Sequence, residues 1–162
     1  MSATSRSDKD TDTKILAAIE RLANANRAWL QSVATANGLT PMQVQIIEIV
    51  GGAPAEDRKV SAIARELNVR QPTVTDAVNT LEAKGLVKRT ADANDGRASV
   101  VELTAAGRRV EKKLDPTAPG LKSRLKKASN NEKAATANVL TALLNQLIED
   151  EVINAPAGWS AK

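Results

Sequence analysis

The segment from Val60 to Thr104 constrains the fold of this chain more than any other part of the sequence. It opens with two short helical patterns separated by a tight turn at Asn68-Val69, and the second pattern begins at Gln71, with proline next to it, as is common in the first turn of a helix. Two β-prone runs follow, LVKRT and SVVEL, with the strong turn signal Asn-Asp-Gly between them. Two helices joined by a short turn and followed by a hairpin predict a winged helix-turn-helix.

Helical patterns flank this segment on both sides. Apolar residues recur at steps of three and four from Lys14 to about Ala36, and Thr40-Pro41 opens a second helix that two glycines end. The stretch GGAPAEDRK is expected to be a loop, after which Ser61 caps the first short helix. Beyond the hairpin, Thr104 is expected to cap a further helix, and Ser-Asn-Asn-Glu at 129–132 forms a capping box for a last helix to about residue 152.

Composition narrows the function classes. The 162 residues include no Cys and no His, so disulfides, thiolate metal sites and the usual general base are missing. Neither an Asp/Glu cluster with metal-binding spacing nor a Gly-rich phosphate loop is present, so we expect no metal, no cofactor and no enzymatic activity. Two Trp without any Phe or Tyr argue against a platform for single-stranded nucleic acid, which stacks bases on aromatic rings.

The net charge of +4 is modest but unevenly distributed. Ten basic and six acidic side chains lie between Arg58 and Arg109, so the whole excess can be assigned to the predicted winged segment. Such an excess suits a polyanionic partner, although on charge alone a solvated surface explains it equally well. No apolar run approaches the roughly 20 residues that span a bilayer, and the polar N-terminus lacks a signal-peptide core, so we expect a cytoplasmic protein.

The helix that starts at Gln71 is the predicted reading element, because such a helix enters the major groove with its N-terminal residues at the base edges. Gln and Asn side chains can bond adenine in two places, and a Thr methyl can touch the thymine methyl. Each polar residue alone is equally well explained as part of a solvated helix face, but the set, followed by a wing, points to DNA. The expected recognition-helix contacts are Arg70, Gln71, Pro72, Thr73, Thr75, Asp76 and Asn79.

The hairpin tip supplies the predicted wing contact. A flexible cation at Arg97 can enter the minor groove, where narrow A·T tracts concentrate negative potential, and Asp95 is placed to hold it. In isolation the same residues describe an ordinary loop with a surface arginine. The residues expected to contact DNA from the wing and the backbone-facing surface are Ser61, Lys88, Arg89, Asp95 and Arg97.

These motifs closely resemble the MarR family of bacterial transcriptional regulators. The matching pieces are the QPTVT start of the second helix, the LEAKGLV transition, DGR at the wing tip and the VELTAAG exit, and the flanking helices match in layout. The resemblance implies a mainly α fold with a small β-wing, in which a winged helix-turn-helix is joined to N- and C-terminal dimerisation helices. It also implies a homodimer that binds double-stranded DNA at a pseudo-palindrome, usually as a repressor, and is often released by a small organic effector.

Two positions depart from the family pattern. Arg70 stands where relatives usually have a small capping residue, and Asp76 stands where they often have a basic one. Arg70 could reach a phosphate instead of capping, whereas Asp76 would repel phosphates but could accept from cytosine N4. The base preference of this helix is therefore not transferable from relatives.

The resemblance also divides the chain. We expect a disordered lead-in at 1–13, N-terminal helices for dimerisation and support at 14–57, the DNA-binding head at 58–109, C-terminal dimerisation helices at 110–153 and a loose tail at 154–162. Trp29 either anchors the dimer core or stacks on a flat aromatic effector. The apolar stripes expected in the dimer core comprise Ile15, Ile19, Leu22, Leu140, Leu143, Leu144, Leu147 and Ile148.

An alternative from a different class stays open. Winged helices can exchange groove contacts for protein contacts, so the chain could be a protein-interaction module with little or no sequence-specific DNA binding, and Asp76 gives that alternative some support. A non-specific architectural DNA binder fits less well, because such proteins depend on phosphate contacts and the net charge here is modest.

Overall fold

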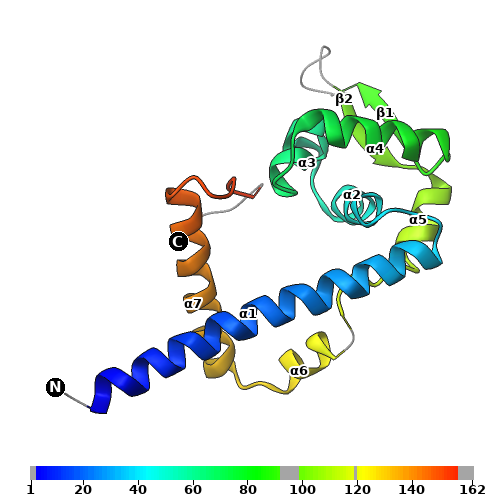
Figure 1. The fold of residues 1–162 in the computed structure, drawn as a ribbon. Helices are drawn as coiled ribbons and strands as arrows, with labels where there is room; N and C mark the ends of the chain where they lie inside the picture. Colours follow the sequence, from blue (N-terminus) through cyan, green and yellow to red (C-terminus); the bar gives the residue numbers. More distant parts are fainter. Residues whose placement is uncertain (1–2, 92–98, 119, 157–162) are drawn as a thin grey trace.

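The computed structural model describes residues 3–91, 99–118 and 120–156 (Figure 1). A two-stranded antiparallel sheet is the one sheet among these residues, and the other regular elements are helices. This confirms the predicted fold class, mainly α with a small β-wing. In chain order the elements are α1 (Ala3–Ala36), α2 (Pro41–Gly52), the 3-10 helix η1 (Ala55–Arg58), α3 (Val60–Glu66), α4 (Gln71–Ala83), β1 (Val87–Ala91), β2 (Ser99–Leu103), α5 (Ala105–Glu111), α6 (Leu121–Lys127) and α7 (Asn130–Glu149).

One hydrophobic core lies between α2, α3, α4 and the sheet, and the C-terminal end of α1 packs against it. We call α2 to α5 with the sheet the head. Aliphatic side chains fill this core, as expected for a chain with almost no aromatic residues. The largest fully buried side chains are Val44, Ile46, Ile47, Ile63, Val74, Val78, Leu81, Val87 and Val101.

The predicted helix boundaries rest on local hydrogen bonds that the structure contains. Thr40 and Gln43 form a capping box at the start of α2, where proline occupies the first turn. The Thr104 hydroxyl accepts from the amide of Gly107 and so caps α5. Ser129 and Glu132 form the expected capping box of α7. These contacts confirm the predicted starts of three helices.

Three expectations are corrected. Ser61 does not cap α3: the helix begins at Val60, with Lys59 at its N-cap, two residues before the predicted cap, and the Lys59 carbonyl accepts from the amide of Ile63. The stretch predicted as a loop before it contains η1. The predicted lead-in at 1–13 is helical from Ala3, because no proline or glycine interrupts it and because Lys14 pairs with Asp10 one turn away.

The sheet provides the base of the wing. β1 and β2 pair in antiparallel register, with Val87 opposite Leu103 and Ala91 opposite Ser99. Lys59 adds an isolated antiparallel bridge to Val100, a third backbone segment that the sequence pattern does not predict. This bridge ties the start of α3 to the wing and explains why α3 begins before Ser61.

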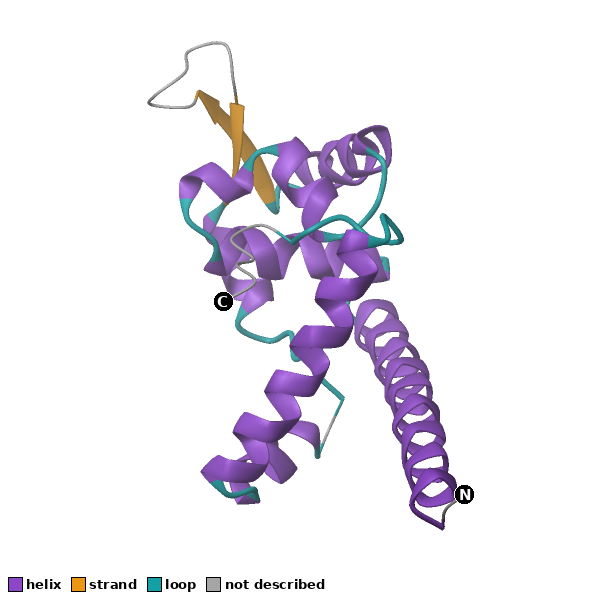
Figure 2. Cartoon of the chain, turned by 90° about the vertical axis from the view of Figure 1, so that its left-hand side faces the viewer, coloured by secondary structure: helices purple, strands orange, loops and turns teal. Residues whose placement is uncertain are grey.

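The terminal helices extend away from the head (Figures 1 and 2). α7 contains no buried residue, and α1 contributes to the core only near its C-terminal end, through Leu30 and Ala34. The tail predicted as loose from residue 154 is anchored at its start, since the backbone and side-chain amides of Asn154 both donate to the Asn68 side chain, at 3.1 and 2.9 Å. No described helix is both long enough and apolar enough to cross a membrane.

Candidate nucleic-acid interface

Helix α4 presents two chemically opposite faces. Val74, Val78 and Leu81 are fully buried against the head, which fixes the rotation of the helix about its axis. The side chains of its first turns that the sequence assigns to base reading point outward: Gln71, Pro72, Thr73 and Asp76 are exposed, and Thr75 is half-buried. The Thr75 hydroxyl donates to the Gln71 carbonyl at 3.1 Å. This bond fixes the side-chain rotamer and leaves the methyl group available for an apolar contact.

Arg70 occupies the N-cap of α4 and makes no side-chain capping bond. Its exposed guanidinium is therefore not used to hold the helix start. This matches the expectation that an arginine here reaches outward and does not replace the small capping residue. In the first turn of α4, Pro72 has no amide hydrogen and the Thr73 amide donates to the Arg70 carbonyl at 3.1 Å, so any preference for an anion at this end comes from the helix dipole.

Asn79 and Arg89 are coupled to each other, which the sequence does not predict. The Arg89 guanidinium donates to Asn79 Oδ1 at 2.7 Å and pairs with the Glu82 carboxylate, and the Arg89 amide donates to the other Glu82 oxygen at 3.2 Å. These bonds join β1 to α4. One lone pair of Asn79 Oδ1 is thus occupied by Arg89, and the second lone pair and the amide nitrogen remain for a base.

A hollow connects α3, α4 and the wing. It brings together the predicted contacts Ser61, Gln71, Thr75 and Arg89, which come from three different elements. Lys59 and Ser99 also line it, and the sequence analysis did not include them. The isolated bridge between Lys59 and Val100 brings Lys59 beside Ser99, and no local sequence pattern predicts that bridge.

Lys88 does not join this surface. Neighbouring residues of a strand point to opposite faces, so Lys88 lies on the far side of β1 from Arg89 and faces Glu102, with Nζ 3.4 Å from the carboxylate. The other two wing contacts, Asp95 and Arg97, lie outside the described residues. The described interface thus consists of α4, the start of α3 and one face of β1.

Known proteins share both the sequence of this region and the fold. Residues 37–98 match the sequence model of the MarR family. A MarR-family regulator from Silicibacter pomeroyi is 27% identical, with 81% of this chain and 86% of that chain covered and a TM-score of 0.64. Over these residues the chain is similar to MarR-family regulators.

Further relatives extend this picture. A putative transcriptional regulatory protein for the hcr operon of Thauera aromatica is 28% identical over 83 residues, so the match spans about half of either protein, 51% of this chain and 49% of the relative. Two solved structures below 25% identity share the fold. The MepR–DNA complex of S. aureus is 21% identical over 80% of this chain and 95% of that chain, at TM-score 0.65. CouR of Rhodococcus jostii RHA1 bound to p-coumaroyl-CoA is 18% identical over 77% of this chain and 87% of that chain, at TM-score 0.64.

Trp29 has a definite hydrogen-bond partner. It is half-buried, and its indole Nε1 donates to the Asp115 carbonyl at 2.9 Å. Three residues earlier, Asn26 Oδ1 accepts from the Ala118 amide at 3.0 Å. Together the two side chains hold the segment between α5 and α6 against α1. Neither the predicted effector contact nor the predicted dimer contact of Trp29 is tested by these bonds.

The residues predicted for dimerisation are largely uncovered within one chain. Leu22 is 50% exposed, and Leu140, Leu143, Leu144 and Leu147 are between 38% and 41% exposed. Ile15 is also exposed, whereas Ile19 and Ile148 are half-buried. Among the described residues, no cluster of Asp and Glu has the arrangement of a metal site.

Proposed function

We propose that the chain is a sequence-specific DNA-binding transcriptional regulator that acts as a homodimer on a pseudo-palindromic operator. The observation that carries this proposal is the amphipathic recognition helix. α4 is locked by three fully buried side chains while Gln71, Thr73 and Asp76 stay exposed beside a hollow that continues to the wing. The match of residues 37–98 to the MarR family and the shared fold of the MepR–DNA complex support the same function.

The terminal helices support the homodimer. Apolar stripes on α1 and α7 are exposed in one chain, although apolar surface of this extent is normally covered in a stable protein. A second copy of the chain offers the same stripes, and a two-fold dimer pairs identical patches. The two heads of such a dimer are related by its two-fold axis and would each read one half-site. We further propose that the bound dimer acts as a repressor.

A selection of bound duplexes from random DNA tests the central proposal. We expect one pseudo-palindrome, with half-site centres about one helical turn apart, roughly 34–36 Å. Affinity should fall steeply as salt rises, because bound phosphates release counterions. Recovery of no preferred sequence would contradict sequence-specific reading and favour a protein-interaction role for the winged head.

The variant Gln71→Ala tests the reading helix. We expect discrimination at one base pair of each half-site to fall by about 1–3 kcal/mol, since a bidentate amide–adenine pair contributes about that much. The measurement is binding of the selected duplex and its single-base variants. Gln31→Ala, an exposed glutamine on α1 outside the head, is the matched control and should bind all duplexes as the unaltered protein does.

We also propose that a small organic effector releases the DNA. CouR, which shares the fold, binds p-coumaroyl-CoA in its solved structure. Trp29 is a built-in reporter, because the chain has only one other tryptophan, Trp159. In a Trp159→Phe variant, an effector near α1 should change Trp29 fluorescence and weaken DNA binding over the same concentration range. A panel of aromatic acids and their thioesters that does neither would contradict this part of the proposal.

A further inference from the structure

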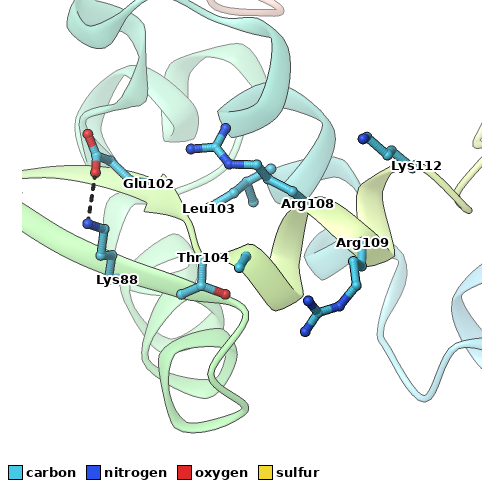
Figure 3. Close-up of a pocket in the computed structure, with 8 residues that line it drawn as sticks. Lys88, Glu102, Leu103, Thr104, Arg108, Arg109 and Lys112 are labelled. Carbon is cyan, nitrogen blue, oxygen red and sulfur yellow. Dashed lines mark ion pairs between the residues drawn. The ribbon is translucent and has the colours of Figure 1, made fainter.

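We propose that a second basic surface, on the flank of the head, binds the phosphates of DNA that lies beyond the half-site. This flank is the hollow where β1, β2 and α5 meet, and its charged residues are Lys88, Glu102, Arg108, Arg109 and Lys112 (Figure 3). The inference rests on the proposed function, because it assumes that α4 places the head on DNA.

The flank carries an excess of positive charge that the described residues do not neutralise. Four cations from β1 and α5 line the hollow with a single carboxylate, Glu102, whose 3.4 Å contact with Lys88 is partly exposed. Arg108, Arg109 and Lys112 are exposed and form no ion pair with any described residue. The nearby acid Glu111 is directed elsewhere, with its carboxylate against Gly51 of α2.

The backbone beneath these cations is held firmly. The Thr104 amide donates to the Leu86 carbonyl at 3.0 Å, and its hydroxyl donates to the Gly85 carbonyl at 2.6 Å while accepting from Gly107. α5 is thereby fixed to the start of β1, next to the end of α4. The backbone that carries these cations is consequently held at a fixed place relative to the reading helix, while their exposed side chains are free to reach a phosphate.

The flank is continuous with the candidate interface. Lys88 and Arg89 are neighbours on β1 and point to its two faces, Arg89 toward α4 and Lys88 toward the flank. Because Arg89 pairs with Glu82 and Lys88 lies 3.4 Å from Glu102, the cations without an ion-pair partner among the described residues lie on α5, next to the base of the wing. A duplex seated on α4 would reach this flank by continuing past the wing, or by bending toward the head.

The spread of the cations favours a polymer over a small anion. Arg108 and Lys112 extend on one side of α5 and Arg109 on the other, so their charged groups do not converge on one point (Figure 3). Arg108 and Lys112 are separated by about 6 Å along the helix axis, at 1.5 Å per residue. Each strand of DNA carries one phosphate per ~3.4 Å of helix axis, so cations spread in this way can contact several phosphates of a polymer.

The test compares two duplexes that share one selected operator. The short duplex ends at the outer edge of each half-site, and the long duplex adds about one helical turn of arbitrary sequence on both sides. The combined variant Arg108→Gln, Arg109→Gln, Lys112→Gln should bind the long duplex roughly tenfold more weakly at 0.1 M salt. The slope of log K against log salt should become shallower by about 0.9 for each phosphate that the variant no longer neutralises, while binding of the short duplex stays unchanged.

Matched variants separate this effect from total charge and from folding. Arg124→Gln, Lys126→Gln, Lys127→Gln removes the same charge from the exposed α6, away from the head, and should leave binding of both duplexes unaltered. The substitutions Arg108→Lys and Arg109→Lys keep the charge and should retain the preference for the long duplex. Equal affinity of the triple α5 variant and the unaltered protein for the long duplex would overturn the inference, as would equal losses on both duplexes. Failure to select any operator would instead contradict the proposed function.

Discussion

At the scale of single residues, the close approach of two backbone segments decides where only glycine fits. Gly107 stands in the first turn of α5, where a Cβ would lie 2.0 Å from the backbone carbonyl oxygen of Leu86. The same region is held by the Thr104 bonds to Gly85 and Leu86. The glycine is therefore required by the packing of α5 on the wing, although a helix interior normally disfavours it.

Gly107→Ala is expected to lower the free energy of unfolding by about 1–3 kcal/mol, since backbone atoms cannot move aside as a flexible side chain can. The gain in helix propensity, about 1 kcal/mol or less, offsets only part of this loss. Urea unfolding followed by circular dichroism measures the change. Gly52→Ala is the control: nothing lies within 4 Å of a Cβ there, so the variant should be as stable as the unaltered protein or slightly more stable.

At the scale of elements, hydrogen bonds between residues close in sequence set where the helices begin. Hydrogen bonds between residues far apart in sequence set how the helices and strands are placed relative to one another. The Ser129 hydroxyl and amide both donate to the Glu132 carboxylate, at 2.7 and 2.8 Å, and these bonds hold the pKa of Glu132 below its ordinary value of 4.5. By contrast, α4 and β1 are joined through Arg89, Asn79 and Glu82, which lie seven to ten residues apart in the chain.

The capping box predicts a dependence on pH. A carboxyl whose pKa is lowered by folding contributes stability above its ordinary pKa, and this contribution is lost as pH falls through the lowered value. Glu132→Gln should therefore unfold at a lower temperature than the unaltered protein at pH 7, and the two midpoints should converge as pH falls below the lowered pKa of Glu132. Thermal unfolding across a pH series measures this. A difference in midpoint that is constant with pH would show that the Glu132 charge plays no part.

At the scale of the whole molecule, the single chain has a packed head and terminal helices that leave apolar surface uncovered. α7 buries no residue, and its leucines form one stripe with Val139, which is 49% exposed. Burying each such side chain in a dimer contributes on the order of 1 kcal/mol, because about half of its apolar surface is still exposed. Several of them on each copy are sufficient to hold two chains together at the proposed interface.

The double variant Leu143→Glu, Leu147→Glu should be monomeric at concentrations where the unaltered chain is a dimer, since burying two extra charges per copy is strongly unfavourable. Size-exclusion chromatography with light scattering measures the mass. Operator affinity should fall by several orders of magnitude, because one head then binds without the other. Asn138→Glu adds a charge on the opposite side of α7 and should remain dimeric. A dimeric double variant would place the interface elsewhere.

Much of this architecture is readable from the sequence, because it depends on local chemistry. Thr40, Thr104 and Ser129 cap the helices that follow them, and the apolar period of α4 predicts the buried Val74, Val78 and Leu81. Each of these features involves residues within one or two turns of each other. The winged head and the MarR resemblance are recognisable for the same reason, since the motifs that carry them are short and contiguous.

Tertiary structure alone decided how those elements meet. The partners of Arg89, the hydrogen bonds from Asn154 to Asn68 and the bridge from Lys59 to Val100 depend on the path of the chain between them. Strand periodicity places Lys88 and Arg89 on opposite faces, but only the packed head shows that one face meets α4 and the other meets α5. The sequence by itself therefore determined the elements and their exposed chemistry, because backbone capping and side-chain periodicity act over a few residues. Interactions between residues far apart in the chain depend on the packing of the whole head. They place the predicted DNA-binding residue Arg89 on the reading surface and Lys88 on the separate basic flank.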